Sequence, residues 1–399
     1  MMWLWLLIGM FFTTSASALG PGELTGFVAA DVRVFPFSPA FPEQLDRSVV
    51  PSLVFQPEYR YGWNNGQDRI TIVPFGRLEY GDDNRTHFDL RELNWLHIAP
   101  SWDLLFGVGK VFWGVTESRH LVDIINQTDL VEDIDAEDKL GQPMLRFSLL
   151  RDWGTLTLFA LPRFRERTFP GPKGRLRAEP YVDTDDPVFE SPLKQWQPDF
   201  AVRWTHTLDA FDISLAYFYG TSREPRLLPS QDQTDRFVLL PHYDLMHQAS
   251  LDVQFTMGNW LGKLEAIIRS GYGSRFAALV GGFEYTFYGI FGTAFDLGVL
   301  GEYLYDGRND EAPPTPFNND AFVGVRLTFN DVQSTEILAG SVVDLDTRAT
   351  LLNLEASRRI GQRWKLEVEV RAFVNIPPSD VLFSVRRDDY IQVRVARFF

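Results

Sequence analysis

The last eleven residues, Asp389-Tyr-Ile-Gln-Val-Arg-Val-Ala-Arg-Phe-Phe399, carry the pattern that decides the fold. Apolar side chains occupy alternate positions: Ile391, Val393, Val395 and Phe399. Gln392 and Arg394 lie between them, on the opposite face. Successive side chains of a β-strand point to opposite sides, so this stretch predicts a strand with one apolar and one polar wall.

The same alternation recurs along most of the chain. In residues 363–374, five apolar positions alternate with Lys365, Glu367, Glu369 and Arg371. We predict about 18 strands, or 16 if the two weakest are absent; bacterial barrels have an even number of strands. The predicted spans are 23–34, 52–63, 68–80, 86–98, 102–113, 143–151, 154–164, 198–208, 210–220, 243–257, 260–270, 275–288, 292–305, 320–329, 333–344, 348–359, 363–374 and 389–399.

The connections between these strands fall into two kinds, which alternate along the chain. Every second connection is short, and several contain the Asn, Asp and Gly of tight turns, as at 64–67 and 361–362. All the long connections fall in the other set: 35–51, 114–142, 165–197, 221–242, 306–319 and 375–388. Outer-membrane barrels have short periplasmic turns and long extracellular loops, so this sorting predicts a closed antiparallel transmembrane β-barrel.

Composition narrows the class of protein. The 399 residues include no Cys, which excludes disulfides, thiolate metal sites and a Cys nucleophile. The formal net charge of −15 argues against non-specific nucleic-acid binding. The longest apolar run, 1–18, ends in Ala16-Ser17-Ala18 and predicts a signal peptide that is cleaved near Ala18. An uncleaved N-terminal anchor is the alternative, because no Lys or Arg precedes the run.

The terminal strand resembles the closing strand of Gram-negative outer-membrane β-barrels, which ends on Phe after alternate apolar residues. Arg397 departs from that pattern, which prefers an aromatic there. The resemblance implies an outer-membrane location for a single barrel domain, 19–399. It also implies contact with lipid and lipopolysaccharide, and recognition of the C-terminal strand by the barrel assembly machinery. The stretch from Gly107 to Asp129 is similar to a segment of several porin-like families and implies a channel-type barrel.

The polar faces of the strands supply the candidate lining of the lumen. Acids and bases there are nearly balanced, and a salt-bridge lattice that stiffens the wall is the alternative role for any one of them. The pore-lining candidates are Glu58, Arg60, Arg77, Glu79, Arg203, Lys263, Glu265, Arg269, Arg326, Lys365, Glu367, Glu369, Arg371 and Arg394.

The third long connection, 114–142, combines many acids with an apolar patch at 121–125 that an exposed loop would not need. It resembles the third outer loop of general porins, which folds back into the barrel and narrows it. Folded inward, its acids would favour cations or neutral solutes. Left outside, they would bind divalent cations near the lipopolysaccharide headgroups. The constriction candidates are Glu117, Arg119, Asp123, Asp129, Glu132, Asp133 and Asp135.

The sequence predicts no catalytic, cofactor-binding or metal site. It contains no G-x-S-x-G elbow, no H-E-x-x-H helix and no phosphate-binding glycine loop. We therefore predict a passive channel for small hydrophilic solutes rather than an enzyme. Two alternatives remain open: an exporter of a secreted polymer, similar to alginate-export barrels, and a structural or adhesive barrel whose outer loops bind a ligand.

Overall fold

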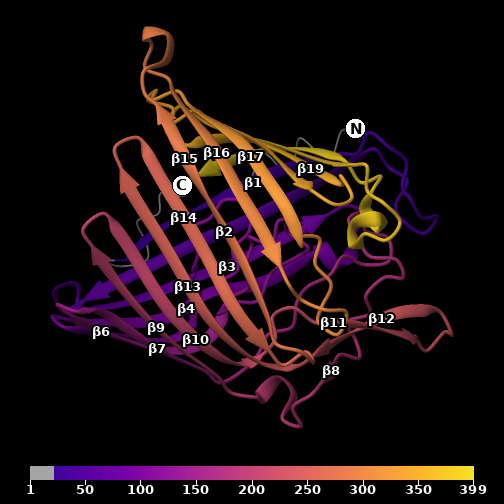
Figure 1. Cartoon of the computed structure of the whole chain (residues 1–399), viewed down its shortest axis with the longest axis horizontal. Helices are drawn as coiled ribbons and strands as arrows, with labels where there is room; N and C mark the ends of the chain where they lie inside the picture. The colour runs from indigo at the N-terminus through magenta and orange to yellow at the C-terminus, as the bar shows by residue number, and fades with distance from the viewer. Residues whose placement is uncertain (1–21) are drawn as a thin grey trace.

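The computed structural model describes residues 22–399, so the predicted signal peptide lies outside the described residues. One antiparallel sheet of 18 strands closes on itself, because β1 (Glu23–Val34) pairs with β21 (Tyr390–Phe398) as well as with its neighbour β2 (Val49–Trp63). Figure 1 shows the strands running side by side around one barrel. The predicted fold class is confirmed.

Each strand of the wall pairs with the next one along the chain. The remaining wall strands are β3 (Asp68–Glu79), β4 (His87–Ala99), β5 (Trp102–Gly109), β6 (Gln142–Arg151), β7 (Gly154–Leu161), β9 (Asp199–Leu208), β10 (Phe211–Thr221), β13 (Leu245–Met257), β14 (Trp260–Ser270), β15 (Phe276–Phe287), β16 (Asp296–Asp306), β17 (Asn319–Thr328), β18 (Glu336–Asp344), β19 (Thr350–Ile360) and β20 (Trp364–Val374). The strand β7 pairs directly with β9.

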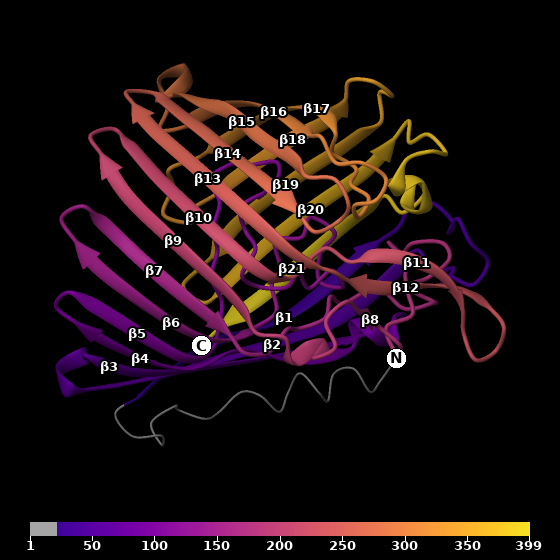
Figure 2. The same ribbon diagram turned by 60° about the horizontal axis from the view of Figure 1, so that its bottom comes forward.

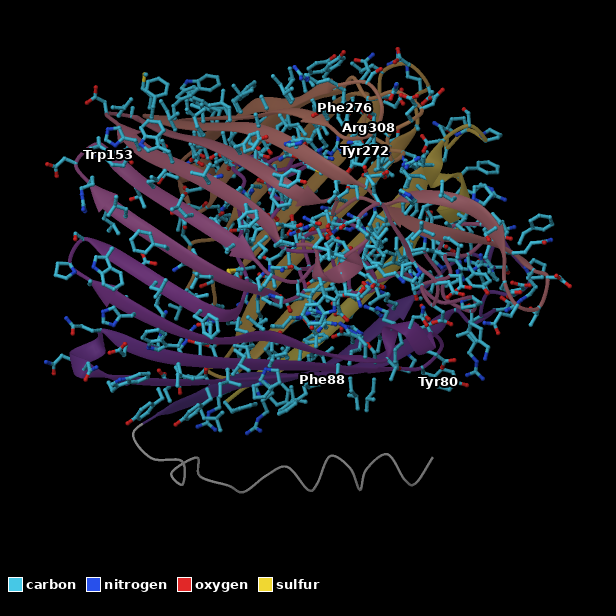
Figure 3. The ribbon with its side chains drawn as sticks, turned by 90° about the horizontal axis from the view of Figure 1, so that it is seen from below. Tyr80, Phe88, Trp153, Tyr272, Phe276 and Arg308 are labelled. Carbon is cyan, nitrogen blue, oxygen red and sulfur yellow. The ribbon has the colours of Figure 1, made fainter. Side chains whose placement is uncertain are left out.

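The wall has the polarity of a membrane barrel, with charges inside and apolar residues outside. Asp31 and Arg77 on inner positions are buried, whereas Leu78 and Phe88 on outer positions are exposed. Figure 3 shows Phe88 pointing outward from the wall, and Arg308 inside the molecule. Because lipid rather than water surrounds such a wall, apolar residues on its outer face stabilise it.

The two rims differ as the sequence predicts. One rim has short turns such as 100–101 and 258–259, and the other has the long connections (Figure 2). Short 3-10 helices lie in the connections: η1 (Asn64–Gly66), η2 (Asp83–Arg85), η3 (Lys194–Trp196), η4 (Ile290–Gly292) and η5 (Val381–Val385). No helix of the described chain has the length and apolarity needed to cross a membrane.

Three features differ from the sequence-based prediction. The strand predicted at 102–113 ends at Gly109, because Trp113 leaves the wall and becomes buried within the barrel. The strand predicted at 292–305 begins at Asp296, after a long turn. The connections at 165–197 and 221–242, where no strand was predicted, contribute β8 (Val188–Phe189), β11 (Arg226–Gln231) and β12 (Phe237–Tyr243), which form a small sheet outside the wall.

Candidate functional site

The connection between β5 and β6, residues 110–141, turns back into the barrel; we call it the lumenal segment. Its backbone N–H groups at Val115, Thr116 and Val122 donate to the carboxylate of Glu265 on β14, at 2.7, 3.1 and 3.1 Å. Glu302 on β16 accepts from two further backbone N–H groups, at residues 117 and 118. Two inward-pointing carboxylates thus hold the start of the segment against the wall.

Asn126 fixes the base of the lumenal segment, where the chain enters and leaves the wall. Its side-chain oxygen accepts from the N–H of Val111 at 2.9 Å, and its amide donates to the carbonyls of Gly109 and Leu140 at 2.9 and 2.8 Å. Asp123 accepts from the backbone N–H of residue 113 in the same way. The polar residues that suggested a porin-like segment therefore close the loop at its base.

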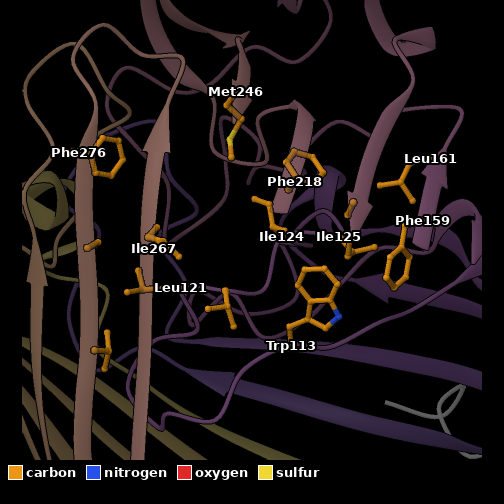
Figure 4. Close-up of a cluster of buried hydrophobic side chains, with 14 of the residues drawn as sticks. Trp113, Leu121, Ile124, Ile125, Phe159, Leu161, Phe218, Met246, Ile267 and Phe276 are labelled. Carbon is orange, nitrogen blue, oxygen red and sulfur yellow. The ribbon is translucent and has the colours of Figure 1, made fainter. Parts of the chain in front are cut away.

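An apolar cluster fastens one side of the lumenal segment. Leu121, Val122, Ile124 and Ile125 are all buried, with Trp113 beside them. Figure 4 shows these side chains packed among residues of the wall. The wall residues labelled there are Phe159, Leu161, Phe218, Met246, Ile267 and Phe276. Burial of this apolar surface away from lumenal water stabilises the in-folded position.

Ion pairs fasten the other side. Arg91 on β4 donates to Asp129 at 2.6 Å, and Arg371 on β20 donates to Asp135 at 2.7 Å. Burial acts to raise the pKa of Asp129. The hydrogen bond with His87 and the charge of Arg91 outweigh burial and hold this pKa below its usual range. Charge-assisted contacts therefore hold this side of the segment, where Ile134 also packs against an apolar cluster that includes Phe373.

His87 lies beside Asp129 and Glu132, and the three offer ligand atoms within 4.8 Å of one another. The same carboxylate oxygens already accept hydrogen bonds from Arg91 and Arg77, at 2.6 and 2.7 Å. These guanidinium groups supply the positive charge that a metal ion would bring. We therefore assign the three residues to the ion-pair network.

A cavity of about 520 Å³ separates the lumenal segment from the wall formed by β17–β21. Ten carboxylates and four cationic side chains line it. Each cationic side chain already pairs with a carboxylate: Arg326 with Glu117, Lys365 with Glu367, Arg371 with Asp135, and Arg394 with Asp31. Most of the other carboxylates also pair with Arg, among them Glu132, Glu336, Glu355 and Glu369. Glu137 and Asp138 are the two lining carboxylates without an Arg or Lys partner in the described chain, and Glu137 lies 3.6 Å from His120.

Asp138 stands out among these carboxylates. Asp138 is exposed at the cavity, and it lies among the other acids of the lumenal segment. The surrounding segment reduces the solvation of this carboxylate. This desolvation and the negative charges of Glu132 and Asp133 raise the pKa of Asp138 to about 6. Its charge is therefore present at neutral pH and is lost in mildly acidic solution.

The structure places the pore-lining candidates in three groups. Those that contact the lumenal segment are Arg77, Lys263, Glu265, Arg326 and Arg371. Those that pair along or across the wall, or with an outer connection, are Glu58 with Arg60, Glu79 with Arg85, Arg203 with Asp252, Arg269 with Glu224, and Arg394 with Asp31. Those that border the cavity beside the segment are Lys365, Glu367 and Glu369.

Six of the seven constriction candidates pair with residues of the wall strands, and Asp123 pairs within the segment. Their partners are Lys263 for Glu117, Asp306 for Arg119, Lys139 for Asp123, Arg91 for Asp129, Arg77 for Glu132, and Arg371 for Asp133 and Asp135. Glu117, Glu132, Asp133 and Asp135 also border the cavity. Their role in permeation stays a prediction.

Three important residues were absent from the predicted site: Asp89, Arg91 and Glu224. Asp89 and Arg91 alternate with apolar residues on β4, so their parity was a usable signal. Glu224 gave no such signal, because it lies in an outer connection. Burial acts to raise the pKa of Glu224. The positive charges nearby, chiefly those of Arg308 and Arg269, outweigh burial and hold this pKa well below its usual range.

Comparison with solved structures identifies the architecture. The chain resembles Acinetobacter baumannii OccAB3, with a TM-score of 0.55 at 6% identity over 96% of this chain and 100% of that one. It also resembles Escherichia coli Wzi, described as a carbohydrate-binding β-barrel involved in group 1 capsule assembly, with a TM-score of 0.53 at 9% identity over 92% and 83%. The chain also resembles Pseudomonas aeruginosa OccD3, with a TM-score of 0.52 at 10% identity over 96% of this chain and 91% of that one.

Sequence comparison adds no closer relationship: no protein-family model matches the chain, and no curated protein matches its sequence. At identities of 10% or below, the structural likenesses establish the fold and not the solute. The chain therefore has a closed β-barrel fold like that of the outer-membrane protein Wzi.

Proposed function

We propose that this barrel is a passive channel for small hydrophilic solutes and that it favours cations. The observation that carries the proposal is the cavity beside the lumenal segment, where ten carboxylates outnumber four cationic side chains and where Glu137 and Asp138 make no ion pair with any described Arg or Lys. Fixed negative charge in a narrow aqueous passage raises the local concentration of cations and repels anions.

The same charge balance argues against export of a polyanion. A polyanion route needs net positive charge along its wall, and the bases around this cavity are outnumbered by acids. The OccAB3 and OccD3 likenesses support a barrel of channel type, and they leave the transported solute to experiment.

Planar-bilayer recording of the refolded chain tests the proposal. We expect ion conductance and, under a KCl gradient, a reversal potential of the sign set by cation preference. The double variant Glu137→Gln, Asp138→Asn should weaken that preference, since both side chains border the cavity and neither pairs with Arg or Lys.

The matched control is Glu58→Gln, Asp103→Asn. Both acids pair with neighbours near the periplasmic rim, Glu58 with Arg60 and Asp103 with Arg146, and lie outside the cavity. This variant should keep the selectivity of the parent. A chain that conducts under no applied potential, or that prefers anions, would refute the proposed function.

Ligand binding by the outer loops is a second candidate, favoured by aromatic residues that the outer sheet and its neighbours expose. Phe237 on β12 and Trp196 are both exposed, and Arg163 stacks on the Trp196 ring at 5.1 Å. If the barrel is adhesive, Trp196→Ala with Phe237→Ser should abolish binding to polysaccharide-coated surfaces and leave conductance unchanged. Unchanged binding would remove this candidate.

A further inference from the structure

The turn between β15 and β16, residues 288–295, differs from the other turns of the periplasmic rim. It is long, and Figure 1 shows it projecting beyond its neighbours. Its tip is apolar, since Phe291 is 96% exposed and Tyr288 is 64% exposed. The sequence contains no charged residue from Tyr285 to Phe295, although other turns of this rim carry Asp152, Asp209 or Asp331.

The backbone conformation at the tip is one that a bulky side chain such as that of Phe291 disfavours. Phe291 has φ 56° and ψ 22°, in the left-handed region that bulky side chains disfavour. The turn between β2 and β3 contains the same conformation, with φ 55° and ψ 33°, and places Asn65 there. Asn tolerates this conformation, and its polar side chain suits water. An exposed aromatic ring at such a position gains nothing from the described chain that offsets the strain, which points to an external partner.

The tip is held in place and does not collapse onto the barrel. The N–H of Ile290 donates to the carbonyl of Phe295 at 2.8 Å. The side chain of Asn330, in the turn after β17, donates to the carbonyl of residue 294 at 2.8 Å and to Asp296 at 2.7 Å. The neighbouring turn therefore braces the base of the 288–295 turn and leaves its apolar tip exposed.

This tip continues an aromatic row on the outer face of the barrel. The rings of Trp260 and Tyr285 meet edge to face with centroids 4.6 Å apart, and those of Tyr285 and Phe287 with centroids 4.8 Å apart. Trp260 and Phe287 are exposed on the lipid-facing side. Rows of aromatic residues at strand ends mark the boundary between hydrocarbon and headgroups. The turn thus starts at the membrane boundary.

We propose that the tip formed by Tyr288 and Phe291 inserts into the periplasmic leaflet of the outer membrane and anchors this side of the barrel. Lipid is the occupant that the observations favour, because the tip is uncharged and continuous with the lipid-facing row. Uncharged aromatic segments partition into the headgroup region, whereas a water-exposed tip would carry polar residues as the β2–β3 turn does.

Site-directed labelling tests the insertion. The chain contains no Cys, so a single introduced Cys is labelled specifically. Phe291→Cys is labelled with an environment-sensitive fluorophore and reconstituted in phosphatidylethanolamine–phosphatidylglycerol vesicles. Asn65→Cys is the matched control, because the same backbone conformation presents it on the same rim. We expect the label at 291 to shift to shorter emission wavelength, to be quenched by lipids spin-labelled near the headgroup, and to resist iodide. The label at 65 should show the reverse.

Two results would overturn the proposal. If iodide quenches both labels equally in vesicles, the tip faces water. If the label at 291 resists iodide but is insensitive to spin-labelled lipid, and its protection increases with protein density in the membrane, the tip contacts a second copy of the chain. Far-ultraviolet circular dichroism of each labelled variant checks that the barrel is folded before either comparison is made.

Discussion

Arg77 on β3 donates to both carboxylate oxygens of Glu132 in the lumenal segment, at 2.7 and 2.6 Å. The same guanidinium donates to Asp31 at 2.8 Å and to the hydroxyl of Ser52 at 2.7 Å. Its side chain is fully buried. One side chain therefore joins the first strands of the wall to the segment that fills the lumen.

Removal of this cation should destabilise the protein strongly. Arg77→Ala leaves the carboxylates of Asp31 and Glu132 buried with less compensation, and a broken buried pair of this kind costs about 3–5 kcal/mol. Urea unfolding of the refolded barrel measures the loss. Arg60→Ala is the control, because Arg60 is exposed and pairs with neighbouring Glu58 on the same strand, so about 1 kcal/mol or less is expected. Equal losses for the two variants would contradict the assigned role of Arg77.

Glu265→Ala should free the start of the lumenal segment. The substitution leaves the N–H groups of Val115, Thr116 and Val122 without their acceptor, and each unpaired buried donor costs about 1–3 kcal/mol. Limited proteolysis of the folded barrel should then cut within the segment at protease levels that leave the parent intact. Glu336→Ala, which removes a half-buried lumenal acid that pairs with Arg326, should keep the parent's resistance.

Ile125→Ala tests the apolar fastening. Ile125 is completely buried between the lumenal segment and the wall, so truncation leaves a cavity and should cost about 2–5 kcal/mol. Leu193→Ala, at an exposed position of an outer connection, should change the free energy of unfolding by no more than about 0.5 kcal/mol. If Ile125→Ala is as mild as the control, the segment does not depend on its apolar contacts.

Cation preference should depend on pH near neutrality. The carboxyl of Asp138 has a pKa raised to about 6, so it is ionised above that pH and neutral below it. Lowering the pH from about 7 to about 5 therefore removes negative charge from the cavity, and the reversal potential under a KCl gradient should move toward zero. Asp138→Asn should show the weaker preference already at pH 7, with a flatter response over this interval. A parent channel with constant selectivity across the interval would argue against this assignment.

The wall could be predicted from the sequence because its signal is local. In 363–374, the alternation of Lys365 and Glu367 with apolar neighbours determines which face meets lipid, whatever the rest of the chain does. The outer sheet was missed because β8 is two residues long and β11 contains Pro229, so neither shows a useful periodicity.

The anchorage of the lumenal segment could be predicted only in part. The apolar patch at 121–125 indicated burial, but its partners Phe218 and Ile267 belong to strands far along the chain. The contact between Thr116 and Glu265 likewise joins residues 149 positions apart. Such pairs depend on the route of the connection through the lumen, which alternation does not encode.

The seam between β1 and β21 has a consequence for biogenesis. The first strand of the barrel finds its second partner in the last of its eighteen strands, from Ile391 to Phe398. The cylinder therefore cannot be sealed before that strand is synthesised, and a polypeptide truncated before it would expose two unpaired edges. The lumenal segment contacts strands on both sides of the barrel. It must therefore enter the lumen before β1 pairs with β21, or insert through the open end of the closed barrel afterwards.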